Sequence, residues 1–213
     1  MKKFLTVGEF IQILKNICGD IEKNKDYFSE LDRATGDGDH GVTMSIGWTA
    51  VKKKLDDIAE DITFDKICMP VASNFLSAVG ASAGPLYATA LMRGGAALKD
   101  LSEANSKQIA EFFFAAANGI KDRGKAELGD KTMLDVWLPA ALKIKEASEN
   151  NEDIIEVMRL GAQKAKESME FTKDMVSKKG RSSKLGERSK GFIDPGAASS
   201  HMIINTFYES IKS

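Results

Sequence analysis

The spacing of apolar residues constrains the fold of this chain more than any other feature of its sequence. Apolar residues recur with the period of an amphipathic helix along nearly the whole chain. The period of two that marks a half-buried strand is not convincing in any segment. The sequence therefore predicts an all-α protein, and a length of 213 residues favours one domain over residues 1–213.

Capping residues divide this pattern into eight predicted helices. Thr6 and Glu9 stand in the capping-box relation before the first helix. Gly124 is suited to end the fifth helix, whereas Pro195 is suited to begin the eighth with Asp194 as its cap. We expect helices over about 7–24, 42–56, 65–79, 85–101, 107–123, 133–147, 152–177 and 195–211.

Four of the segments between these helices are richer in glycine and aspartate than a turn requires. They are Leu31–Gly41, Gly80–Gly84, Gly124–Thr132 and Gly180–Gly196. They follow the first, third, fifth and seventh predicted helices, and alternate connections of an antiparallel bundle lie at the same end. The unusual residues are therefore expected to converge at one end of the bundle.

The first of these segments contains three carboxylates, those of Asp32, Asp37 and Asp39, on a turn interrupted by glycines. Three converging carboxylates repel one another unless a cation lies between them, and oxygen ligands favour magnesium, manganese or calcium. An EF-hand is excluded because Trp48 stands where that loop requires a glutamate. The spacing alone leaves a metal site and a solvated turn equally open.

Two other segments contain residues suited to phosphate. Gly80–Pro85 precedes a predicted helix, so its backbone N–H groups could bind a phosphate, or its small residues could serve a close helix crossing. Arg181 lies in a long loop that could bring a guanidinium toward phosphates or could simply be exposed.

The charged residues give no sign of a nucleic-acid or membrane partner. The net charge is −1, with acidic and basic residues interspersed, and no apolar run approaches the roughly 20 residues of a membrane span. The first residues do not form a signal peptide, which predicts a cytoplasmic protein. Cys18 and Cys68 lack metal-site spacing and fit buried, reduced thiols.

Six segments, in order along nearly the whole chain, carry a resemblance to a known family. They are Asp32 with Gly36–Gly41, Gly84–Tyr87, Arg123–Ala126, Gly129–Met133, Leu185–Ser189 and Asp194–Ser200. Together they resemble the L subunit of bacterial dihydroxyacetone kinase, a nucleotide-binding domain of the DAK2 type. The resemblance implies an eight-helix, antiparallel, barrel-like bundle that holds ADP or ATP at one end through two Mg²⁺ ions.

The resemblance also implies a set of site residues. The metal ligands would be Asp32, Asp37 and Asp39, and these three residues with Arg181 would form the catalytic group. The nucleotide would be surrounded by His40, Gly41, Val42, Thr43, Ala81, Ser82, Gly124, Met133, Arg181, Asp194, Pro195 and Gly196. The family usually has asparagine at the position of Thr43 and histidine at that of Phe192, and it places the serine after Gly80 differently.

In such kinases a separate K subunit holds the ketose, and in the phosphotransferase-system version an M subunit regenerates bound ATP. The resemblance therefore implies a phosphotransfer subunit that needs a K-type partner and, in that version, an M-type phosphocarrier. A nucleotide-loaded regulatory protein and a nucleotide module for another ketose or a fatty acid remain alternatives. The sequence leaves open the phosphoryl donor, the acceptor ketose and whether the chain forms a homodimer.

Overall fold

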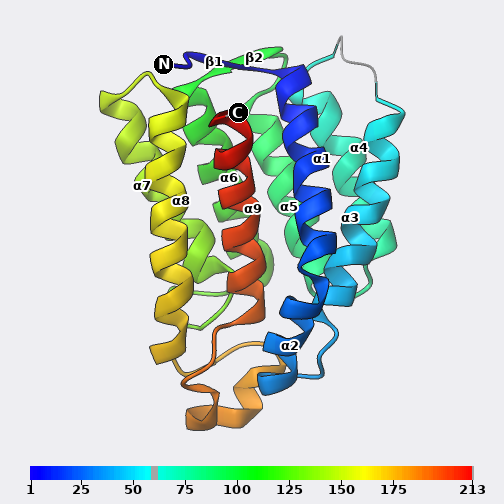
Figure 1. The fold of residues 1–213 in the computed structure, drawn as a ribbon, viewed down its shortest axis with the longest axis vertical. Helices are drawn as coiled ribbons and strands as arrows, with labels where there is room; N and C mark the ends of the chain where they lie inside the picture. The colour runs from blue at the N-terminus through cyan, green and yellow to red at the C-terminus, as the bar shows by residue number, and fades with distance from the viewer. Residues whose placement is uncertain (59–61, 213) are drawn as a thin grey trace.

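The computed structural model describes residues 1–58 and 62–212, and most of these residues lie in long helices that run side by side (Figure 1). The α-helices are α1 (Val7–Lys23), α2 (Lys25–Thr35), α3 (His40–Asp56), α4 (Phe64–Ala78), α5 (Ala83–Ala97), α6 (Ser106–Gly124), α7 (Leu134–Asn150), α8 (Ile154–Phe171) and α9 (Pro195–Lys212). Two 3₁₀ helices, η1 (Thr172–Asp174) and η2 (Arg181–Ser189), lie between α8 and α9. Strands β1 (Phe4–Thr6) and β2 (Glu103–Asn105) pair antiparallel. The all-α prediction is confirmed.

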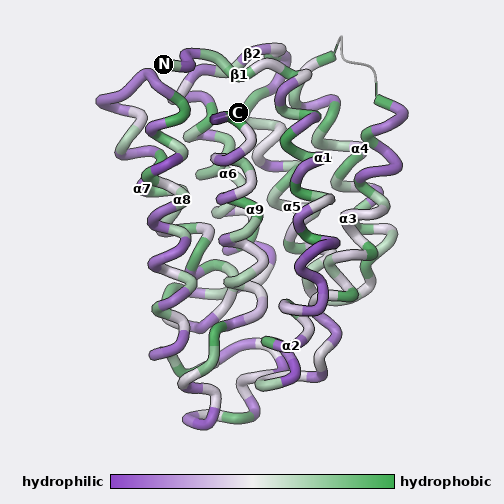
Figure 2. Tube along the Cα trace, viewed as in Figure 1, coloured by the Kyte–Doolittle hydropathy of each residue, from purple (hydrophilic) through white to green (hydrophobic). Residues whose placement is uncertain are grey.

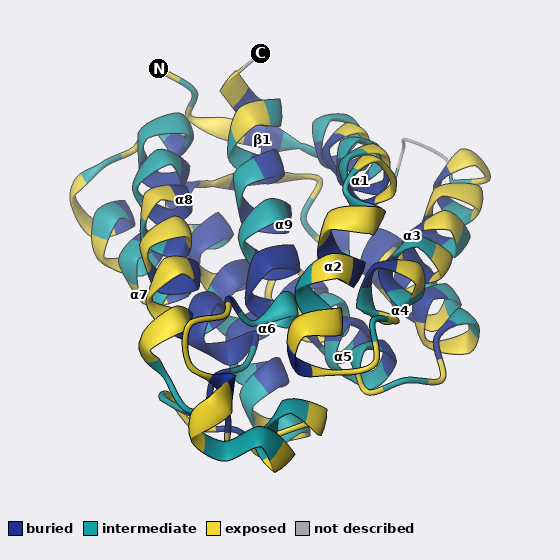
Figure 3. Cartoon of the chain, turned by 60° about the horizontal axis from the view of Figure 1, so that its bottom comes forward, coloured by how far each residue is buried: buried dark blue, intermediate teal, exposed yellow. Residues whose placement is uncertain are grey.

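Eight of the helices form a closed ring. Each of α3 to α8 packs against the next helix in the chain, α9 packs against α8 and α1, and α1 packs against α3. Apolar side chains from all eight helices fill the interior. Hydrophobic and hydrophilic residues alternate along the helices of the ring (Figure 2). Seen from the lower end, the buried residues lie on the inward sides of the helices (Figure 3). This arrangement is the predicted barrel-like bundle.

Local capping chemistry places the helix ends as the sequence predicts. The Thr6 hydroxyl accepts from the Glu9 N–H at 3.3 Å, and the Glu9 carboxylate accepts from the Thr6 N–H at 2.8 Å. At the start of α9 the Asp194 carboxylate accepts from the Ala197 N–H at 2.8 Å. Such caps satisfy backbone donors that a helix start leaves unpaired. α6 ends at Gly124, also as predicted.

Several predicted boundaries were wrong. The helix α2 was missed: only Asn24 separates it from α1, and it buries just Phe28, Ser29 and Thr35, so its apolar pattern is weak. The seventh predicted helix ends at Phe171, where the chain turns into η1. The two strands have three residues each, which is too short for a period of two to be visible.

The strands, both chain termini and the α7–α8 connection lie at the upper end of the bundle in Figure 1. The helix α2 and the orange segment that contains η2 lie at the lower end, which we call the site end. Among the described residues, none of the helices is both long and apolar enough to span a bilayer. Cys18 and Cys68 are buried free thiols, in agreement with the sequence prediction.

The close packing of α4 against α5 in the ring can be tested by a substitution at Gly95. A Cβ added at Gly95 of α5 would lie 2.4 Å from the Cβ of Cys68, which cannot move without its backbone. Gly95→Ala should therefore lower the free energy of unfolding by about 1 to 3 kcal/mol. The matched control is Gly19→Ala on the exposed side of α1, where nothing lies within 4 Å and where alanine should add about 0.5 to 1 kcal/mol. Urea denaturation measures both changes, and equal effects would contradict close packing at Gly95.

Candidate functional site

A cavity of about 720 Å³ opens at the site end. All four of the glycine-rich segments that the sequence singles out contribute to its wall. The contributions include Asp32 and His40 from the first, Gly80–Ala83 from the second, Gly124 and Lys131 from the third, and Gly180–Ser182 with Asp194–Gly196 from the fourth. The prediction that these segments converge at one end is therefore confirmed.

Four helices begin at the wall of this cavity. The lining includes His40 at the start of α3, Ala83 at the start of α5, Met133 just before α7, and Pro195 at the start of α9. The N-terminus of a helix carries a partial positive charge and directs backbone N–H groups outward. Four such ends around one cavity form a site suited to a large anion with several phosphate groups.

The segment Gly80–Gly84 leads into α5, and its sequence left open whether it binds a phosphate or serves a close helix crossing. A Cβ at Gly84 would lie 2.1 Å from the Val79 carbonyl oxygen, so this glycine serves a close approach of two backbones. A Cβ at Gly80, by contrast, would meet nothing within 4 Å, and Gly80–Ala83 line the cavity. Gly84 thus allows close packing at the start of α5, while Gly80–Ala83 face the cavity.

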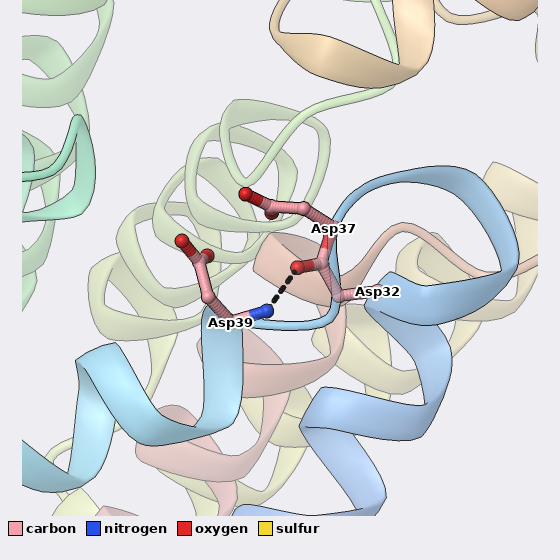
Figure 4. Close-up of side chains that lie close together, drawn as sticks. All are labelled: Asp32, Asp37 and Asp39. Atoms are coloured by element: carbon pink, nitrogen blue, oxygen red, sulfur yellow. Dashed lines mark hydrogen bonds between the residues drawn. The ribbon is translucent and has the colours of Figure 1, made fainter.

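Three carboxylates converge beside the start of α3 (Figure 4). One oxygen from each of Asp32, Asp37 and Asp39 lies within 4.8 Å of the others. The Asp32 carboxylate accepts from the N–H groups of Asp39 at 2.9 Å and of His40 at 3.2 Å. Asp32 is thereby held at the end of α3, while the side chains of Asp37 and Asp39 remain about half exposed.

Arg181 reaches this cluster from the other half of the chain. Its guanidinium forms ion pairs with Asp37 and Asp39, donating to the Asp39 carboxylate at 3.1 Å. Burial and the nearby Asp32 charge both raise the pKa of Asp39, which means that the cluster disfavours its own full ionisation. One guanidinium therefore offsets three carboxylates only in part.

The cluster fits a magnesium ion. Its ligand atoms are all oxygens, the set that hard divalent cations prefer, and no thiolate or imidazole is among them. Half-exposed carboxylates also leave room for the water ligands that Mg²⁺ retains. Burial is the larger cause of the raised pKa of Asp39, and a divalent cation would relieve the smaller one, repulsion from Asp32.

A hydrogen-bonded chain of side chains runs from the partly buried His40 to the buried hydroxyls of Ser199 and Tyr87. The His40 ring Nε2 lies 2.9 Å from the Ser199 hydroxyl, which in turn lies 3.0 Å from the Tyr87 hydroxyl. Burial lowers the pKa of His40 to about 4, so the ring is neutral near pH 7. His40 is thus placed to hydrogen-bond a ligand as a neutral group. Tyr87 and Ser199 lie in two of the family motifs, but the sequence assigned them no site role.

Most of the predicted site residues, both metal ligands and nucleotide-binding residues, line the cavity. They are Asp32, Asp39, His40, Thr43, Ala81, Ser82, Gly124, Met133, Arg181, Asp194, Pro195 and Gly196. Asp37 lies in the carboxylate cluster but not in the cavity wall. The structure does not bring Gly41 and Val42 to the wall: Gly41 packs against the Lys25 backbone, and the Val42 side chain is about half exposed. Their part in nucleotide binding stays a prediction. Only their backbone N–H groups could make such a contact.

The cavity also contains residues that sequence reasoning did not place there. Cationic side chains come from Arg123 and Lys179, and an apolar wall comes from Leu86, Ile120 and Ala126. The two cations lie within or beside the glycine-rich segments, which is the one sequence signal that could have found them. Leu86 and Ala126 lie in two of the family motifs, and Ala126 also lies in the third glycine-rich segment, whereas Ile120 belongs to an ordinary helical pattern and carries no such signal.

Comparison with known proteins gives one family. A model of the DAK2 domain matches residues 34–209. The ADP-binding subunit DhaL of PEP-dependent dihydroxyacetone kinase from Escherichia coli (strain K12) is 39% identical over 184 residues, which cover 85% of this chain and 87% of that subunit. The ADP-binding subunit DhaL of PEP-dependent dihydroxyacetone kinase 2 from Listeria innocua is 36% identical over 206 residues, which cover 95% of this chain and 94% of that subunit.

A solved structure shares the fold. The dihydroxyacetone kinase from C. freundii, crystallised with AMP-PNP and Mg²⁺, matches 94% of this chain with a TM-score of 0.73. The sequence identity is 21%, and this chain spans 33% of the length of that kinase chain. At this identity the likeness supports the ring architecture alone.

The carboxylate cluster predicts a divalent-cation site that can be tested with Mn²⁺. Asp39→Asn keeps the shape of the side chain but removes a charge, so it should weaken Mn²⁺ binding at least about tenfold. The control is Asp57→Asn, an exposed aspartate at the far end of the same helix, which should leave the affinity unchanged. Electron paramagnetic resonance measures free Mn²⁺ in each titration. Equal affinities in the two variants would remove Asp39 from the ligand set.

Asp194 predicts a specific pH dependence of stability. Burial raises the pKa of Asp194 to about 7 in the folded protein, from an ordinary value of 3.8. The folded state therefore keeps its proton over a range in which the unfolded state has lost it, so wild-type stability should fall between about pH 4 and pH 7. Asp194→Asn retains a capping oxygen without the proton, and it should gain at least about 1.4 kcal/mol relative to the wild type over this range. Urea denaturation at pH 5 and pH 8 tests this, and parallel pH profiles would refute it.

Proposed function

The chain belongs to the DAK2 domain family, and we propose that it is the nucleotide-binding, magnesium-dependent phosphotransfer subunit of a dihydroxyacetone kinase. The observation that carries the proposal is a cavity at whose wall four helices begin, with a cluster of three carboxylates beside the start of one of them, α3. Helix N-termini bind phosphate oxygens, and the carboxylates bind the divalent cation that accompanies them. The proposed nucleotide-binding unit is a single domain over residues 1–213.

The carboxylates of Asp32, Asp37 and Asp39 are proposed to hold two Mg²⁺ ions. Magnesium at this position would offset the charge on the phosphates of ADP or ATP during transfer. Arg181 already binds two of these carboxylates, and its guanidinium can exchange one of them for a phosphate oxygen, since both are anionic acceptors. Arg181 is therefore proposed to supply positive charge beside the transferred group.

The remaining walls of the cavity would bind the rest of the nucleotide. Ala81 and Ser82 precede α5 and offer backbone N–H groups to a phosphate, while neutral His40 offers a hydrogen bond from the opposite wall. Leu86, Ile120 and Met133 form an apolar surface on which a purine ring can lie. Thr43, Gly124 and Asp194–Gly196 complete the proposed binding set.

The substrate is proposed to arrive on a second protein. Phosphoryl transfer needs the phosphates to be held in line and their charge offset, and the cavity provides for both. A K-type subunit would dock over the site end and present a short ketose, and an M-type phosphocarrier would regenerate ATP from bound ADP. The two relatives named as ADP-binding subunits of PEP-dependent kinases support this division of labour.

Mixing experiments test the proposal directly. The purified chain should phosphorylate dihydroxyacetone negligibly with saturating ATP and Mg²⁺, because it holds the nucleotide but not the ketose. Addition of a K-type subunit, with either ATP or an M-type phosphocarrier system, should produce ketose phosphate. Turnover that needs the phosphocarrier would assign ADP as a bound cofactor, whereas turnover with ATP alone would make the nucleotide an ordinary substrate.

Two variants make this experiment specific to the site. Asp39→Asn should lower the turnover of the mixture by about 100-fold or more, because it removes a ligand of the proposed metal site. Asp57→Asn should match the wild type. Full turnover by the isolated chain would overturn the two-component proposal, and full activity of Asp39→Asn would overturn the proposed site.

A further inference from the structure

Lys131 is one of the largest fully buried side chains in the protein, with 1% of its surface exposed. Its backbone adopts a left-handed conformation with φ of 60°, which few residues other than glycine take. Lys131 contributes to the cavity wall, but its ammonium donates to the Ser189 carbonyl oxygen at 2.5 Å and to the Met175 carbonyl oxygen at 3.3 Å. The charge is therefore directed into the chain behind the wall.

The two carbonyls that accept from Lys131 belong to the ends of one segment, Met175–Ser189, which we call the Arg181 loop. Met175 follows η1, and Ser189 ends η2. Arg181 lies between them and extends to the carboxylates of Asp37 and Asp39. One ammonium group thus joins the base of the loop that carries the guanidinium.

Neighbouring contacts strengthen the same closure. The Ser189 hydroxyl accepts from the Ser177 N–H at 2.8 Å, and the carbonyl of Asp130, next to Lys131, accepts from the Lys178 N–H at 3.0 Å. Burying an ammonium is unfavourable unless acceptors or opposite charges surround it. The two carbonyls provide the acceptors. Burial lowers the pKa of Lys131, and the charges of Asp194 and Asp174 oppose this effect in part.

We propose that Lys131 is a positioning residue that joins the ends of the Arg181 loop and so holds the Arg181 guanidinium over Asp37 and Asp39. The direction of the ammonium, away from the cavity, distinguishes this role from direct binding of a phosphate. The effect on nucleotide binding rests on the proposed function, whereas the effect on the loop does not.

Hydrogen exchange tests the loop without any nucleotide. Lys131→Met fills a similar volume but leaves two buried carbonyls without their donor. The Ser177 and Lys178 amides should therefore exchange at least about tenfold faster than in the wild type, while amides in the middle of α1 keep their rates. Lys190→Met is the matched control, because it removes an exposed lysine just beyond the loop. Unchanged exchange at Ser177 and Lys178 would overturn the proposal.

A double-mutant cycle tests the route to the site. Lys131→Met and Arg181→Gln should each weaken the binding of Mg²⁺ and ADP, and the double variant should bind no more weakly than Arg181→Gln, because Lys131 acts through Arg181. Multiplying effects would show that Lys131 contacts the ligand itself and would overturn the positioning role. If Lys131→Met does not fold, Lys131→Gln replaces it in both experiments, since its amide can still donate to one carbonyl. Failure of the wild type to bind ADP would count against the proposed function alone, and hydrogen exchange would still decide the role of Lys131.

Discussion

Repulsion among the carboxylates of Asp32, Asp37 and Asp39 is the constraint on which the site end depends. Three negative charges within a few ångströms of one another persist only where nearby groups offset them. Part of the offset comes from α3, whose first N–H groups bind Asp32, and part comes from Arg181 of the long connection between α8 and α9. The two halves of the chain therefore have to meet at this end.

The closed ring satisfies this requirement through the direction of its helices. Since α3, α5, α7 and α9 all begin at the cavity, their partial positive ends add to the same local field. Among the described residues, the opposite end holds the short α7–α8 connection and the small β1–β2 sheet. The long, glycine-rich connections of the chain thus lie at the end where a ligand has to be accommodated. The absence of a side chain at Gly84 allows the start of α5 to approach the end of α4 at Val79 closely.

The sequence predicted the parts of this structure that depend on local chemistry. Caps at Thr6 and Asp194, the end of α6 at Gly124 and the convergence of four segments follow from residues within a turn of one another or from the alternation of helix direction. The helix α2 escaped prediction because it buries so few residues that its pattern is weak. The contact between His40 and Ser199 joins positions 159 residues apart, and no local pattern encodes it. The same holds for Lys131, because the direction of its ammonium is set by carbonyls that only the folded loop brings near.

The site divides into a rigid part and an open part, and this division bears on the need for a partner. Asp32, His40 and the helix starts are held by backbone and buried side-chain contacts, whereas Asp37, Asp39 and Arg181 keep about half of their side chains exposed. Charge interactions are weak where water surrounds them and strengthen several-fold when water is excluded. A docked subunit that covers these three side chains would therefore strengthen the electrostatic terms that phosphoryl transfer requires. On this argument the proposed second protein would do more than deliver the ketose, because its arrival would complete the low-dielectric environment in which the charges of the first can act.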